Sequence, residues 1–324
     1  MQLRERFRQV MAFDTSLTPP RFESEFPDDT VATWRAAGHL GDKSPEQVFG
    51  IDRREDLGIA WRRTHGEKSV LHTEEDIAGL ATTYDPADPD RIPKDWQART
   101  TRWRNGEHCV FTKPWNEGFL QVLGIGNAVT LTDALTLLCE RPNLAEAAME
   151  HYASFLETLV ERVLADVQVD FAFFYAPIAS NHGPVVSPET YRRFVVPALR
   201  RTVDCLERHG VHYRFMWSAG NIHALIPLWL DTGINGLFLN RPHEAGMSYL
   251  GLREDFGNEL RHLGGVNWQI LMQGEGAIDE ELRCNVAPLL EQGGYIPHLD
   301  DTVRSYVPFE AFRHYRRALD KLLP

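Results

Sequence analysis

From about residue 106 to the end of the chain, short runs of β-branched and aromatic residues alternate with longer segments whose apolar residues recur every three or four positions. The short runs predict strands and the longer segments predict amphipathic helices, an order typical of β-α-β units with a parallel sheet. We expect strands at residues 108–113, 170–175, 212–217, 234–239, 262–266 and 293–298.

Helical segments between these strands have clear boundaries. An apolar stripe along 143–167 predicts one long amphipathic helix. The segment 187–210 opens with Ser187 as an N-cap, continues with proline and closes on glycine, so we expect one helix there as well. A C-terminal helix is expected from about Pro308.

Weaker strand patterns at 21–26 and 57–61 bring the expected number of strands to eight. Eight strands alternating with helices predict an α/β fold of the (β/α)8 TIM-barrel type. An open doubly wound sheet is the alternative, but GIGNAV at 124–129 neither follows a strand nor fits the GxGxxG pattern of that fold. We therefore expect a single barrel domain over residues 1–324, with an N-terminal helical segment and a loop-rich stretch at 62–105.

The composition is that of a globular protein with an acidic surface. Lysine and arginine number 34 against 46 aspartates and glutamates, which gives a formal net charge of −12 and argues against a nucleic-acid partner. No apolar run approaches the ~18 residues that a membrane span needs, and the N-terminus lacks the order of a secretory signal, so we expect no membrane association and a cytoplasmic location. The four cysteines lie far apart without CxxC spacing, which predicts reduced thiols.

The second half of the chain resembles the uroporphyrinogen decarboxylase superfamily block by block. The matching blocks, in order and with similar spacing, are GPVVSPETYRRFVVPALRRTVDCLERHGV, WSAGNI, LIPLWLDTGINGLF, EAGMSYLGLREDFGNELRHLGGVN and GGYIP…VPFEAFRHYRRAL. In the first half, TVATWRAAG, FGID and YDPADPDRIPKDW more weakly resemble a branch of uncharacterised decarboxylase-like members. The resemblance implies a (β/α)8 barrel with its site at the C-terminal ends of the strands, and a homodimer. It leaves the reaction open, because this superfamily joins porphyrinogen decarboxylases to zinc-dependent methyltransferases that work with corrinoid proteins.

Several residues that carry chemistry in those relatives are replaced in this chain. The His-x-Cys pair that follows the fifth strand in the zinc methyltransferases corresponds to Trp217 and Ala219, and residues 293–304 contain no cysteine. The arginine-rich RQAGRY motif of uroporphyrinogen decarboxylases reads PPRFESEFP here, and the histidine of the family's GHG turn corresponds to Asp301. We therefore expect no metal, no cofactor and a substrate other than uroporphyrinogen, whose eight carboxylates would meet too little positive charge.

Polar and aromatic residues at the predicted strand ends make up the candidate site. Catalytic roles are expected for Tyr175, His298, Asp300 and Asp301. Substrate contacts are expected for Lys113, Trp115, Trp217, Asn240, Arg241, His243, Asn267 and Trp268. Trp115, Tyr175, Trp217 and Trp268 are expected to line one pocket, since all four end predicted strands. Each residue also has an ordinary structural interpretation, such as a loop hydrogen bond or a snorkelling lysine.

Three functions remain open on these residues. The first is a metal-free carboxy-lyase acting on a small aromatic or heteroaromatic acid, in which Lys113 or Arg241 orients the carboxylate and Asp300 or Asp301 acts as the acid. Lys113 has no acidic neighbour in the sequence, so we expect an unpaired cation that awaits the substrate. A corrinoid-linked methyltransferase and a non-catalytic ligand-binding barrel are the alternatives. Aromatic residues at strand ends favour a flat, weakly charged ligand in each case.

Overall fold

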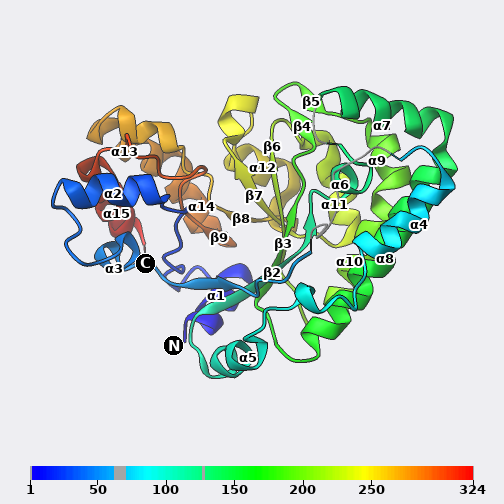
Figure 1. The fold of residues 1–324 in the computed structure, drawn as a ribbon. Helices are drawn as coiled ribbons and strands as arrows, with labels where there is room; N and C mark the ends of the chain where they lie inside the picture. Colours follow the sequence, from blue (N-terminus) through cyan, green and yellow to red (C-terminus); the bar gives the residue numbers. More distant parts are fainter. Residues whose placement is uncertain (1, 62–70, 126–127, 324) are drawn as a thin grey trace.

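The computed structural model describes residues 2–61, 71–125 and 128–323, and in these residues seven parallel strands form one curled sheet at the centre of the molecule (Figure 1). Along the sheet the strands are β1 (Arg54–Asp56), β2 (Cys109–Asn116), β3 (Phe171–Tyr175), β6 (Arg214–Ala219), β7 (Gly236–Asn240), β8 (Arg261–Leu263) and β9 (Tyr295–Ile296). All six strands predicted from residue 108 onward are confirmed, and the α/β class with them. A short antiparallel hairpin of β4 (Ala179–Ser180) and β5 (Gly183–Pro184) stands apart from the sheet.

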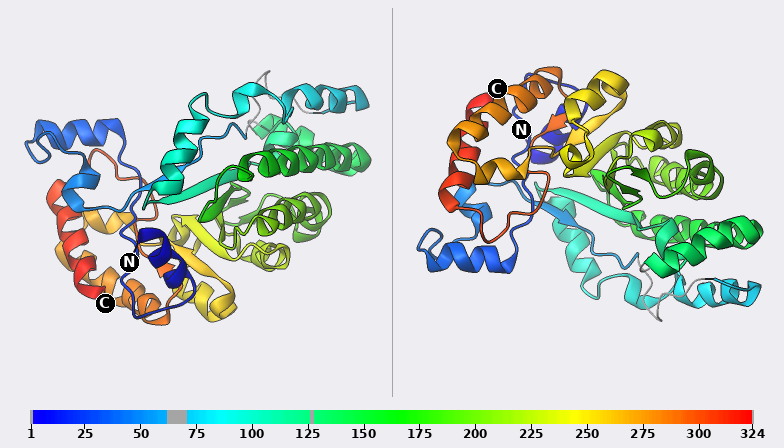
Figure 2. Two further views of the ribbon diagram at one scale, coloured as in Figure 1. Left: turned by 90° about the horizontal axis from the view of Figure 1, so that it is seen from below. Right: turned by 90° about the horizontal axis from the view of Figure 1, so that it is seen from above.

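Most of the helices lie between successive strands and cover the outer side of the sheet, whereas the first three of the described helices precede the first strand (Figures 1 and 2). In the first half of the chain they are α1 (Leu3–Met11), α2 (Asp28–Ala36), α3 (Pro45–Phe49), α4 (Glu74–Thr83), α5 (Trp96–Asn105), α6 (Phe119–Val122), α7 (Ala128–Glu140) and α8 (Pro142–Leu164). In the second half they are α9 (Pro188–Phe194), α10 (Val196–Arg208), α11 (Ile226–Thr232), α12 (Tyr249–Phe256), α13 (Glu275–Glu281), α14 (Ala287–Gln292) and α15 (Phe309–Leu322). Figures 1 and 2 show α2, α3, α13 and α15 gathered on one side of the molecule.

Alternation along the strands separates two apolar cores. In β3, Phe171 and Phe173 belong to the core inside the curl, whereas Ala172 and Phe174 belong to the core between sheet and helices, as the two-residue period of a strand requires. Phe7 of α1 packs on Phe171 with ring centroids 5.0 Å apart. Aromatic side chains and α1 therefore fill the N-terminal end of the curl, and any site must lie at the other end.

The segment 21–26, predicted as one of the eight strands, is not a strand. It nevertheless lies between the two edges of the sheet: the Arg21 carbonyl accepts the Asp52 N–H (3.0 Å) before β1, and the Glu23 carboxylate accepts the Leu299 N–H (3.0 Å) after β9. Prolines at 19, 20 and 27 flank it, and proline cannot donate to a ladder. One backbone hydrogen bond and one hydrogen bond to a side chain thus make the connection between the sheet edges where a strand was expected.

Three other expectations need correction. The strand predicted at 57–61 lies just upstream, as β1. The single helix predicted at 187–210 is divided into α9 and α10, because Pro197 removes a backbone donor next to the junction at Val195. The stretch expected to be loop-rich, 62–105, contains the ten-residue helices α4 and α5 among its described residues. The predicted long helix and C-terminal helix are confirmed as α8 and α15.

Candidate active site

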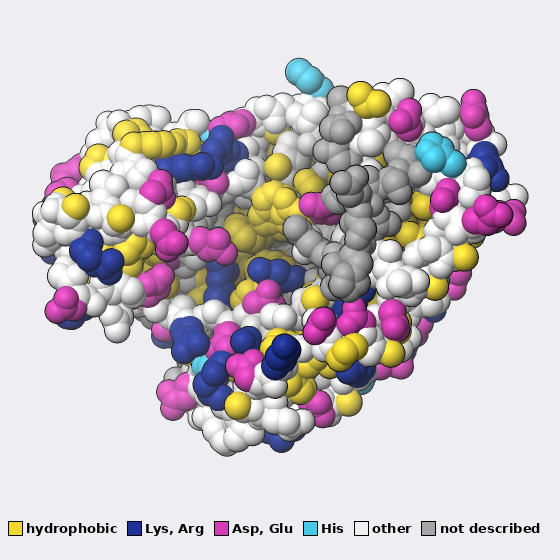
Figure 3. Space-filling model, viewed as in Figure 1, with side chains coloured by type: hydrophobic (Ala, Val, Ile, Leu, Met, Phe, Trp, Pro, Cys, Tyr) yellow, Lys and Arg dark blue, Asp and Glu magenta, His cyan; other side chains and the backbone are white. Residues whose placement is uncertain are grey.

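A cavity of about 1350 Å³ opens at the C-terminal ends of the strands. Figure 3 shows this face hollowed, with hydrophobic side chains inside the hollow and charged side chains around it. The lining combines residues of the strands, the 21–26 segment, the α3 region and the loop after β9. Its described members are Glu23, Ser24, Glu25, Phe26, Glu46, Gln47, Gly50, Ile51, Asp52, Arg53, Arg54, Asp56, Phe111, Lys113, Asn116, Phe173, Tyr175, Trp217, Phe238, Asn240, Asp300, Asp301 and Thr302.

Tyr175 and Trp217 form an aromatic wall of the cavity. They pair in direct register on the adjacent strands β3 and β6, and their rings stack with centroids 4.4 Å apart and an interplanar angle of 25°. Phe111, Phe173 and Phe238 line the same cavity. A flat apolar surface of this kind suits an aromatic ligand.

The other two tryptophans expected in the lining lie elsewhere. A register shift in β2 between Thr112 and Trp115 reverses the alternation, so Trp115 packs on Tyr152 of α8 (5.5 Å between ring centroids) and is only 1% exposed. Trp268 begins the 3-10 turn η5 (Trp268–Met272), where the Arg241 guanidinium lies 5.3 Å from its ring centroid. Of the expected four aromatics, Tyr175 and Trp217 alone are among the described lining residues.

Lys113 lies in the cavity as expected, but it is not unpaired. Its Nζ is 3.3 Å from Oδ2 of Asp56, and the two side chains are 41% and 33% exposed. The residues are 57 positions apart in the sequence and meet because β1 and β2 are neighbouring strands. Asp56 is a site residue that the sequence analysis missed, and a strand predicted at its true position would have placed Asp56 at a strand end.

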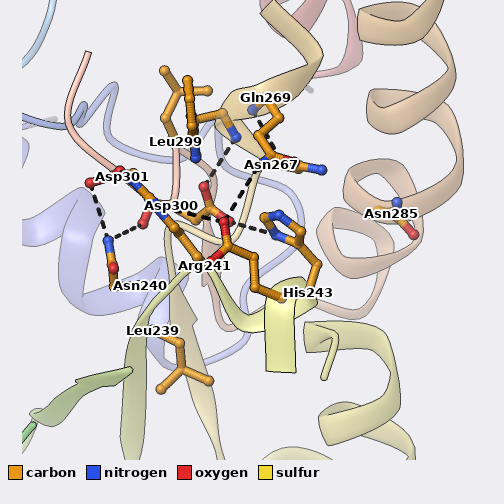
Figure 4. Close-up of polar contacts among 12 residues, drawn as sticks. Leu239, Asn240, Arg241, His243, Asn267, Gln269, Asn285, Leu299, Asp300 and Asp301 are labelled. Carbon is orange, nitrogen blue, oxygen red and sulfur yellow. Dashed lines mark hydrogen bonds and ion pairs between the residues drawn. The ribbon is translucent and has the colours of Figure 1, made fainter. Parts of the chain in front are cut away.

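Asp300 joins the loop after β9 to two turns that follow neighbouring strands (Figure 4). Oδ1 accepts the Trp268 N–H at 3.0 Å, and Oδ2 lies 3.2 Å from Nδ1 of His243, which belongs to η3 (Pro242–Ala245). Burial raises the pKa of the Asp300 carboxyl, and the contacts with His243 and Trp268 offset this only in part. The hydrogen bond to Asp300 raises the pKa of His243.

Asp301 has the opposite environment although it is the next residue. Its Oδ2 accepts a hydrogen bond from Nε of Arg241 (2.8 Å) and lies 3.3 Å from Arg304, while Oδ1 accepts one from Nδ2 of Asn240 (3.2 Å). Arg241 has a left-handed backbone (φ 47°), unusual for a residue with a side chain, just before Pro242. Burial would raise the pKa of Asp301, but the Arg241 hydrogen bond and the Thr302 N–H outweigh it and lower the pKa. Two adjacent carboxyls with pKa values shifted in opposite directions suit an acid and an ionised partner.

His298 and Asn267 lie outside the cavity lining. The His298 side chain is fully buried, with Nδ1 2.8 Å from the Leu299 carbonyl and its ring 5.0 Å from that of Phe238. Burial lowers the pKa of His298 to about 3, so the ring is neutral. Asn267 caps η5 by accepting the Gln269 N–H at 2.9 Å. Both contacts are structural ones.

The described residues do not fit a zinc site. No group of three or more histidine, cysteine, aspartate or glutamate side chains in this part of the chain is arranged to hold a metal ion. The sequence resemblance assigns Trp217 and Ala219 to the positions of two zinc ligands of the methyltransferases, and neither side chain can bind zinc. The two aspartates that follow the last strand already have partners: Asp301 pairs with Arg241, and Asp300 pairs with His243.

Comparison with known protein families matches residues 124–322, more than half of the chain, to the model of the uroporphyrinogen decarboxylase (URO-D) family. The chain belongs to the uroporphyrinogen decarboxylase family. This confirms the resemblance found in the sequence blocks, and the family is one of enzymes.

Two solved structures are similar to this member of the URO-D family. A methyltransferase from Methanosarcina mazei aligns with a TM-score of 0.64 and 15% identity over 99% of each chain. The YdhT protein from Bacillus subtilis aligns with a TM-score of 0.42 and 9% identity over 92% of this chain and 88% of its own. The first likeness supports the fold over the whole chain. No curated protein sequence matches significantly.

No helix in the described residues is long and apolar enough to cross a membrane.

Proposed function

We propose that this protein is a cofactor-independent carboxy-lyase that removes CO2 from a small, flat aromatic or heteroaromatic acid. One observation carries the proposal: the Tyr175–Trp217 stack and the Lys113 ammonium line the same cavity at the C-terminal ends of the strands. The stack binds the ring, and Lys113 binds the carboxylate. The ammonium has three N–H donors, so Asp56 does not exhaust its capacity.

The reaction breaks the bond between the ring carbon and the carboxylate, and the electron pair stays on the ring until that carbon takes a proton. Asp300 is the proposed proton donor, because burial raises its pKa and it lines the cavity. His243, at 3.2 Å, returns a proton to Asp300. Asp301 stays ionised and holds Arg241 in place.

The charges of the lining argue against uroporphyrinogen as substrate. Among the described lining residues seven are acidic and three are basic. A substrate with eight carboxylates would be repelled there, whereas a ring with one carboxylate needs one cation.

The test is CO2 release from a panel of one-ring and two-ring aromatic acids, run in D2O so that the product carries deuterium at the ring carbon that lost CO2. Lys113→Met should lower kcat/KM by roughly ten- to a hundredfold, the effect of one charge-assisted hydrogen bond. Lys94→Met is the matched control, since Lys94 is exposed and absent from the lining. Absence of CO2 release from every acid would contradict the proposal, as would a fully active Lys113→Met variant.

Methyl transfer is the second candidate, favoured by the full-length structural likeness to the Methanosarcina mazei methyltransferase. It is distinguished by metal analysis of protein purified without chelator. Stoichiometric zinc would favour methyl transfer to a thiol. Tight binding of an aromatic acid with neither turnover nor metal would favour a ligand-binding barrel.

A further inference from the structure

We infer that the ligand of this cavity is a zwitterion: a flat ring with one carboxylate and one positively charged nitrogen. The inference rests on the proposed function, because it names the substrate class of the same site. It starts from the Lys113–Asp56 pair, in which two opposite charges lie 3.3 Å apart in an aromatic-lined cavity.

A ligand with a carboxylate alone would disturb this pair. Once the ligand's carboxylate binds Lys113, it faces the carboxylate of Asp56 across a shared ammonium. The remaining contact of Asp56 given by the structure is the Gly58 N–H, 3.3 Å from Oδ1. A partly buried carboxylate that loses half of its counterion is unfavourable unless another positive charge replaces it.

The other two cations of the described lining face other carboxylates. Arg53 pairs with Glu55 at 2.9 Å. Nη2 of Arg54 donates to the Glu23 carbonyl at 3.0 Å, its buried Nη1 has no hydrogen-bond partner among the described residues, and its charge interacts with Glu23 and Glu25.

In the part of the chain that the structure describes, neither arginine pairs with Asp56, and the lining has more acidic than basic residues. The positive charge that replaces Lys113 at Asp56 therefore comes, in this inference, from the ligand. A ligand that carries both charges exchanges one ion pair for two, with its carboxylate at Lys113 and its nitrogen at Asp56.

The aromatic wall supports the same conclusion. A cationic ring stacked on Trp217 or Tyr175 gains cation–π attraction that a neutral ring lacks. The charge also serves the proposed chemistry when the nitrogen adjoins the carbon that carries the carboxylate. The electron pair left when the C–C bond breaks is then stabilised by the positive nitrogen, CO2 departs, and the carbon takes one proton.

Three one-ring probes test the inference by calorimetry: benzoate, the N-methylpyridinium ion and N-methylpyridinium-2-carboxylate, in which the positive nitrogen adjoins the carbon that carries the carboxylate. The last should bind about tenfold more tightly than benzoate, the gain expected from one added ion pair together with the cation–π contact to the aromatic wall. Equal or weaker binding of the zwitterion would overturn the inference, and so would its failure to bind at millimolar concentration.

Two variants give the matched comparison. Asp56→Asn should weaken binding of the zwitterion and strengthen binding of benzoate, because Lys113 is released. Lys113→Met should weaken binding of both carboxylates and spare N-methylpyridinium. Asp95→Asn breaks the Asp95–Arg99 pair (2.7 Å), which lies away from the lining. It should leave the affinities for all three probes unchanged. If Asp56→Asn does not fold, the affinities of the wild-type protein for the three probes still test the inference.

Failure of this inference differs from failure of the proposed function. Tight binding of the zwitterion without CO2 release from any acid would refute the reaction and leave the ligand class standing. Release of CO2 from acids with neutral rings, together with equal binding of the probes, would refute the ligand class and leave the reaction standing.

Discussion

His298 should make the stability of this protein depend on pH in a way that identifies its role. The ring is buried and its pKa is lowered to about 3 from 6.5 because burial disfavours the charged form. The unfolded chain binds a proton at His298 below about pH 6.5, whereas the folded chain stays neutral there. Stability from this residue is therefore full above pH 6.5 and is lost as pH falls toward 3.

The size of the effect follows from the same two values. Each pH unit below 6.5 lowers the free energy of unfolding by up to about 1.4 kcal/mol, and the loss between pH 7 and pH 5 is about 2 kcal/mol. His298→Leu removes this dependence, although losing the hydrogen bond to the Leu299 carbonyl changes stability at every pH. His262, also fully buried with a pKa well below its ordinary value, keeps a similar dependence in the variant.

Urea unfolding at pH 7 and at pH 5 measures the difference. The wild type should lose about 2 kcal/mol more than His298→Leu over this interval. His182→Leu, at an exposed position, is the control and should behave like the wild type. Equal losses in the wild type and His298→Leu would show that His298 accepts a proton in the folded state, which would refute the burial argument and restore His298 as a catalytic candidate.

Three further predictions concern the site and its support. His243→Gln removes a contact that lowers the pKa of Asp300, so the pKa rises further and the loss of CO2 release with increasing pH should move to higher pH; a move to lower pH would contradict the pairing. Trp217→Leu should weaken benzoate binding roughly three- to tenfold, from ~0.5–1.5 kcal/mol of stacking, and unchanged affinity in a titration would place the ligand elsewhere. Asp170→Ala should lower the free energy of unfolding, measured with urea, by about 3 kcal/mol or more, because Asp170 is buried and pairs with Arg4 (2.9 Å). A loss below about 1 kcal/mol would contradict a stabilising role for this buried ion pair.

Local pattern was enough to predict most of the sheet. The run DFAFFY places Phe171, Phe173 and Tyr175 on one face of a strand, and the structure turns that face inward, with Tyr175 in the cavity. Trp217 could be expected in the cavity for the same reason. These predictions succeed because side-chain alternation and burial are encoded within five or six consecutive residues.

Pairing between distant segments was decided by the tertiary structure alone. Lys113 looks unpaired in the sequence, yet the neighbouring strand brings Asp56 to it. Trp115 leaves the cavity because of a register shift in β2 that no local pattern indicates. The opposite pKa shifts of Asp300 and Asp301 depend on which turns reach them. Register, bulges and counterions depend on contacts between residues far apart in the chain, and a sequence pattern records which residues are buried without recording which residues they meet.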